Sequence, residues 1–148
     1  MTKATKRMMK AALMLGTLTM AAAALTGCAT QVKSLPLAAA GGESRGAVPV
    51  YFGEQNHPAV KRDLGDVSYS VRIARKVADA DDACRDALTE AIGKLRAAAR
   101  ERSANAVIDI KTRFHSSESN SSREFTCGVS QSAAAIAVSG RLVVLDAN

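Results

Sequence analysis

The segment ADADDACRDALTEAIGKLRAAARER, residues 78–102, decides the fold because it is the clearest helix in the chain. Asp79, Asp81 and Asp82 offer N-caps and negative charge at its start, and arginines gather at its end. Its apolar side chains recur every three or four residues, which places them on one face of a helix. They are Cys84, Leu88, Ala91, Ile92, Leu95 and Ala99. The sequence therefore predicts one long helix with a single buried stripe.

Segments on both sides of this helix have the patterns of β-strands. Apolar and polar residues alternate, or β-branched residues form short runs, in 48–52, 67–73, 106–114, 124–129 and 136–145. A helix with one apolar face needs such a sheet to cover that face. The predicted fold is α+β: a small, mainly antiparallel sheet with the long helix packed on one face.

The predicted faces and connections follow from the same patterns. The segment Ser103-Ala104-Asn105 is expected to end the helix, with Asn105 as the residue that tolerates the left-handed conformation. Connecting segments are predicted at 54–65 (a loop or helical turn), 115–122 (a polar hairpin loop) and 130–135 (a turn). Two sets of side chains are expected to face the core: Ala106, Ile108, Ile110 and Phe114 from one strand, and Phe125, Cys127 and Val129 from another.

The N-terminus has the features of a bacterial lipoprotein signal. Four basic residues in the first ten precede an uncharged run of about 15 residues, which is short for a membrane span but fits a signal-peptide core. The run ends in Leu25-Thr26-Gly27-Cys28, which resembles a lipobox. We therefore predict a signal peptide at 1–27 and lipidation of Cys28 by acyl chains such as palmitate. A plain secretory signal with an incidental cysteine is the alternative.

The residue after that cysteine bears on the membrane. Ala29 stands where enterobacterial lipoproteins kept at the inner membrane carry aspartate, so the resemblance implies the periplasmic face of the outer membrane. Residues 28–47 are expected to be a lipidated tether, which if flexible spans roughly 25 Å. The alternative is that part of this segment packs as an extra strand, using Val32, Leu35 and Leu37. The periplasmic domain is predicted at 48–148.

Removal of the signal peptide changes the charge of the protein. Of the 20 basic residues four lie in the signal, and none of the 14 acidic residues does, which leaves 16 against 14. Binding to nucleic acid therefore has no support from net charge. We expect neither nucleic acid nor nucleotide as a partner.

Cys84 and Cys127 are the two cysteines left when Cys28 is lipidated. In an oxidising periplasm we expect them to form one disulfide between helix and strand, worth about 4 kcal/mol for a loop of about 44 residues. Metal ligation is the competing interpretation, although the chain has no CxxC motif and no HxxxH motif to complete a zinc site.

Three pieces of the chain resemble a group of small exported lipoproteins from Gram-negative bacteria: VYFGEQNHPAV (50–60), DACRDALTEAIGKLRAAARERSANAVIDIKT (82–112) and REFTCGVSQSAAAIAVSGRLVVL (123–145). More distantly, the helix and following strand are similar to YbjQ-like domains and to the Rcs-pathway outer-membrane stress-sensor lipoprotein. These resemblances imply an α+β fold, and the sensor implies a helix-to-strand disulfide.

Members of that group often carry the label of an excinuclease ATPase subunit, which the residues here do not support. A phosphate-binding loop needs GxxxxGK[ST]. The nearest segment, Gly41 to Val48, lacks both the lysine and the hydroxyl.

Other chemistry has little support in the sequence. His57 and His115, the only histidines, are candidate metal ligands only if the fold brings them together, and the simpler interpretation is two solvated loop residues. No serine lies in a GxSxG elbow, so we expect no enzymatic activity and no cofactor. Two hypotheses remain: a non-enzymatic envelope lipoprotein that binds an envelope protein or senses envelope state, and a metal- or redox-responsive periplasmic binding protein.

Overall fold

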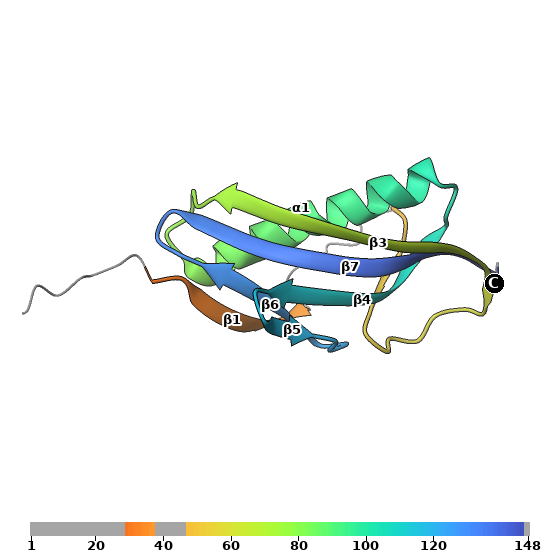
Figure 1. Ribbon diagram of the computed structural model, residues 1–148, viewed down its shortest axis with the longest axis horizontal. Helices are drawn as coiled ribbons and strands as arrows, with labels where there is room; N and C mark the ends of the chain where they lie inside the picture. Colours follow the sequence, from red (N-terminus) through yellow and green to blue (C-terminus); the bar gives the residue numbers. More distant parts are fainter. Residues whose placement is uncertain (1–28, 38–46, 147–148) are drawn as a thin grey trace, which may run out of the picture.

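A long helix, α1 (Ala80–Glu101), lies across one face of a seven-stranded sheet in the computed structural model, which describes residues 29–37 and 47–146 (Figure 1). The strands are β1 (Gln31–Pro36), β2 (Val50–Phe52), β3 (Val60–Ala74), β4 (Ala106–Phe114), β5 (Ser117–Ser119), β6 (Glu124–Val129) and β7 (Ala133–Leu145). All strand pairs are antiparallel except β2 with β4. The predicted α+β fold is confirmed. The predicted signal peptide, Cys28 and part of the tether lie outside the described residues.

The helix begins where the sequence predicts. Asp79 is the N-cap, and its carboxylate accepts hydrogen bonds from the backbone N–H groups of Asp82 and Asp81. These two bonds favour the charged carboxylate and lower the pKa of Asp79. At the other end the left-handed residue is Ser103 (φ 55°), not Asn105 as expected. The Asn105 side chain bonds the backbone of Leu145 in both directions instead, which ties the end of the helix to the end of β7.

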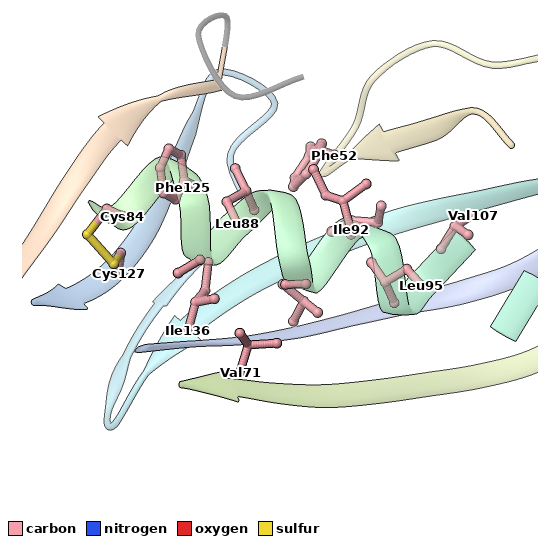
Figure 2. Close-up of a cluster of buried hydrophobic side chains, with 14 of the residues drawn as sticks. Phe52, Val71, Cys84, Leu88, Ile92, Leu95, Val107, Phe125, Cys127 and Ile136 are labelled. Atoms are coloured by element: carbon pink, nitrogen blue, oxygen red, sulfur yellow. A yellow bond between two sulfur atoms is a disulfide. The ribbon is translucent and has the colours of Figure 1, made fainter. Parts of the chain in front are cut away.

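β7 is the centre of the sheet. It pairs with β3 along one side over a long register, from Val60↔Leu145 to Ala74↔Ala133. Its other side pairs with β4 along most of its length and with β6 at its start. β1 continues the sheet beyond β6, while β2 and β5 lie beside β4. α1 lies over β3, β7 and β6, and the core is the layer between helix and sheet (Figure 2).

The core contains mostly small aliphatic side chains. Leu88, Ile92 and Leu95 of α1 are buried, and Figure 2 shows them among core side chains that come from several strands. Phe125 is the largest side chain that is fully buried. As predicted, Phe125, Cys127 and Val129 all face this core.

The expectation of a tether over 28–47 is wrong for Gln31–Pro36, which form β1. These residues pair with β6 from Gln31↔Val129 to Pro36↔Glu124. Leu35 is buried in the core, and Lys33 Nζ donates to Asp81 Oδ1 at the start of α1. The alternative of an extra strand therefore describes this segment, because β6 offers an unpaired edge that β1 covers. Residues 38–46 lie outside the described part.

Two other predicted connections also contain strands. The expected loop at 54–65 ends early, because β3 already begins at Val60 and pairs with β7. The expected hairpin loop at 115–122 contains β5, whose Ser117 pairs with Phe114. The predicted turn at 130–135 is shorter as well, since β7 begins at Ala133.

A bulge in β4 corrects the predicted faces of that strand. Ile108 pairs with Arg141 and Lys111 pairs with Ser139, so two residues of β4 oppose Gly140 alone. Asp109 adopts a left-handed φ of 53° at this point. Because the extra residue shifts the alternation, Val107 and Ile110 join the core under the helix. Ala106 and Ile108 instead form a second small cluster, with Val143 and Leu145, covered by Tyr51.

None of the helices in the described ranges is both long and apolar enough to cross a membrane.

Candidate functional site

A disulfide joins Cys84 in the second turn of α1 to Cys127 in β6 (Figure 2). The two Cα atoms lie 5.8 Å apart, and both side chains are fully buried. The helix places Cys84 on its core stripe and the strand places Cys127 on its inner face, so the predicted pairing is confirmed. The competing interpretation as metal ligands does not hold here, because the bonded sulfurs are not thiolates.

The two histidines are not brought together. His57 stacks edge-on against Tyr51 of β2, with ring centroids 5.5 Å apart, and its Nδ1 lies 2.8 Å from the Pro58 carbonyl oxygen. β2 pairs with the first half of β4, whereas His115 follows the end of β4. The His115 ring packs edge-on against Phe114, with ring centroids 4.2 Å apart. The condition for a joint metal site is therefore not met. Within the described residues, no three His, Cys, Asp or Glu side chains are grouped to hold a metal ion.

A hollow of about 380 Å³ lies on the sheet face that points away from α1. Its polar side chains alternate along β3 and β7 with the core residues Val67 and Leu142, which places these polar side chains on the open face. The residues that line it are Asp66, Val67, Ser68, Asp109, Lys111, Ser139, Gly140 and Arg141.

Arg141 is the centre of the charged groups in this hollow. Its guanidinium lies 3.8 Å from Asp63, 3.6 Å from Asp66 and 3.6 Å from Asp109. The Arg141 side chain is 45% exposed and the carboxylates are at least as open, so solvent and salt screen these ion pairs. They hold the arginine in place without removing it from water.

Two backbone irregularities build this arrangement. β3 shifts register between Asp63 and Asp66, where Gly65 takes φ 93° and donates its N–H to the Asp63 carboxylate. The bulge at Asp109 in β4 lies on the other side of β7. Each irregularity places an aspartate beside Arg141, because β3 and β4 both pair with β7 there.

Hydroxyl, carboxylate and cationic groups line the hollow. The hydroxyls of Ser68 and Ser139 have no histidine among the lining residues to activate them. Lys111 is drawn toward Glu118 of β5, 3.9 Å away. A partner with its own charged or hydrogen-bonding side chains can exchange with these solvent-exposed ion pairs at little cost in free energy.

The sequence did not point to this site. Asp63 and Asp66 are neighbours in the sequence, but Asp109 and Arg141 are far from them along the chain, and no motif joins the three segments. The single local signal is a charged residue inside the apolar run Val107-Ile108-Asp109-Ile110, which marks the bulge. Only the register of three strands shows which charges meet.

No family model, no curated protein and no solved structure matches this chain.

Proposed function

We propose that this protein is a non-enzymatic lipoprotein of the bacterial envelope, anchored through Cys28, with a domain that binds an envelope partner. The observation that carries the proposal is the buried Cys84–Cys127 disulfide. Structural disulfides form in oxidising compartments such as the periplasm. The disulfide therefore supports the same export to the periplasm that the lipobox-like segment Leu25–Cys28 predicts.

The open face of the sheet is the surface proposed for the partner. It carries exposed polar and charged side chains around Arg141, and the hollow makes this part of the face concave. Charged and polar groups arranged on a concave surface can complement those of a partner, and this complementarity gives an interface its orientation and specificity. The proposed location is the periplasmic face of the outer membrane, because Ala29, and not aspartate, follows the cysteine proposed to be lipidated.

The anchor is tested by Cys28→Ser in the full-length chain, expressed in a Gram-negative host. Labelling with palmitate and fractionation of the envelope are the measurements. Wild type is expected to incorporate label and sediment with outer membranes, and Cys28→Ser to lose both properties. The matched control, Cys84→Ala/Cys127→Ala, should keep its label because it leaves the lipobox intact. Continued sedimentation and labelling of Cys28→Ser would overturn the anchor.

The partner surface is tested separately by charge reversal. Arg141→Glu changes the hollow, while Lys94→Glu makes the same change on the exposed face of α1. Cross-linking in intact cells is expected to give a product that is lost with Arg141→Glu and retained with Lys94→Glu. Equal products from both variants would remove the open face from the proposal.

A further inference from the structure

The start of β1 leaves almost no tether between the proposed lipid and the folded domain. Only Ala29 and Thr30 separate Cys28 from Gln31, which already pairs with Val129 of β6. A fully extended chain covers at most about 11 Å from Cys28 to Gln31. A flexible tether over 28–47 would have spanned roughly 25 Å and left the domain free to turn.

One end of the domain gathers the chain segments nearest to this attachment point. At this end β1 begins, β6 ends, β7 begins, β3 ends and α1 begins (Figure 1, left). We call residues 74–79 and 129–133 the proximal end. The distal end, at the right in Figure 1, contains the loop 53–59 and the end of β7.

We propose that the proximal end rests on the phospholipid surface that holds the acyl chains of Cys28, with the distal end directed away from the membrane. This inference rests on the proposed lipidation of Cys28. It goes further by assigning a membrane-contacting surface and a fixed orientation to the domain.

β1 is attached rigidly to the rest of the domain. β1 pairs with β6 at six successive positions, and Leu35 is buried in the core. The Lys33 side chain donates a hydrogen bond to Asp81 at the start of α1. Lys33 also pairs with Cys127 of β6, the residue whose disulfide with Cys84 joins β6 to α1. The strand, the helix start and β6 therefore move as one unit, so the short link to Cys28 acts on the whole domain.

The domain is much longer than the link that joins it to Cys28. β3 runs from the distal to the proximal end over Val60–Ala74, about 45 Å at strand rise. A link of about 11 Å is much shorter than this. The proximal end therefore stays near the lipid surface, and Arg141, which lies opposite Asp66, stands about 25 Å along β3 from Ala74. The hollow is then held above the membrane and opens to the side.

The proximal end carries charged side chains of both signs. Arg75 bonds the backbone carbonyls of Val77, Ala78 and Ser130, so it closes this end of the fold. Lys76 and Asp79 are exposed, and the first-turn acids Asp81 and Asp82 are paired with Lys33 and Arg85. Gln131 and Ser132 at the tip of the β6–β7 turn are uncharged. Charges of both signs are therefore mixed at this end and form no polybasic patch, so the anchor and its length set the contact.

The test uses the absence of tryptophan from the sequence. Gln131→Trp puts a single energy donor at the exposed proximal tip, and Asn56→Trp puts one in the exposed distal loop. Each full-length acylated variant is reconstituted into phosphatidylethanolamine–phosphatidylglycerol vesicles that contain dansyl-labelled headgroups. Transfer to dansyl falls steeply with distance, so we expect several-fold more transfer from position 131 than from position 56.

A flexible Gly/Ser insertion between Ala29 and Thr30 is the matched control. About 20 residues restore a reach of roughly 25 Å and should reduce the difference between the two donors. Equal transfer from both positions in the uninserted protein would overturn the orientation, whether the domain tumbles or lies flat. Mass spectrometry separates the two proposals. Unmodified Cys28 would sink the lipoprotein and this inference together, whereas acylated protein with equal transfer would sink the orientation alone.

Discussion

Gly140 lies opposite the bulge in β4, where two residues face it across the ladder. A Cβ atom at this position would lie 2.8 Å from Val107 Cγ1 and 3.1 Å from Ile110 Cγ1. Both neighbours belong to the core under α1. The bulge moves these side chains over β7, and glycine is the residue that leaves them room.

Gly140→Ala is therefore expected to destabilise the domain by about 1–3 kcal/mol through overpacking. Gly93→Ala is the matched control, because that exposed helical glycine has no atom within 4 Å of an added Cβ. It should stabilise the domain by about 0.5–1 kcal/mol, since alanine loses less backbone entropy in a helix. Urea denaturation of both variants measures the difference. Equal effects of the two substitutions would show that the bulge leaves free space at Gly140.

Residue positions at the bulge mark the limit of what the sequence predicts. Strict alternation puts Ile108 and Ile110 on one face, and a single extra residue at Asp109 separates them. Strict alternation of apolar and polar residues cannot show where a strand contains an extra, bulged residue. The charges around Arg141 depend on the same irregularities, so the hollow was equally hidden, whereas the cysteine pair was predictable because each cysteine lies on a regular apolar stripe.

Elements with one clear apolar face were predicted closely, and edge strands were not. α1 differs from its predicted range by two residues at its start and one at its end, because its stripe and its cap are both local signals. β3 was predicted only from Val67, since Lys61, Arg62 and Asp63 are exposed and show no buried face. These residues become a strand because β7 supplies backbone partners along the whole of β3, which is a tertiary effect.

β1 is the element whose role is most directly testable. Leu35 is 7% exposed and Val32, on the same strand, is 51% exposed. If β1 is part of the folded sheet, Leu35→Ala should cost about 2–4 kcal/mol of unfolding free energy. Val32→Ala should change it by no more than about 0.5 kcal/mol. Chemical denaturation of the mature domain distinguishes them. A negligible cost at Leu35 would return this segment to the role of a tether and remove the basis for a fixed orientation at the membrane.

At the scale of the whole molecule, α1 and the sheet enclose a core of small side chains. Aromatic residues make up only 3% of the chain. A domain of this size is stabilised by roughly 5–15 kcal/mol in total. The disulfide crosses the interface between helix and sheet, from α1 to β6. It links two cysteines that are 43 positions apart in the sequence. Its share of the stability is therefore large.

The disulfide also decides between a structural and a redox-responsive protein. Because Cys84 and Cys127 are fully buried, a reductant reaches them only when the domain opens, so mild reductant should release no thiols from the native protein. Thiols should appear once denaturant is added. Cys84→Ala/Cys127→Ala should lose about 4 kcal/mol of unfolding free energy, since the unfolded chain gains the entropy of an open loop. Thiol titration of the wild-type protein before and after denaturant is added measures the first effect, and urea denaturation of the wild-type protein and the double variant measures the second. Rapid reduction under native conditions with an unchanged melting temperature would contradict the structural role and favour the redox-responsive alternative.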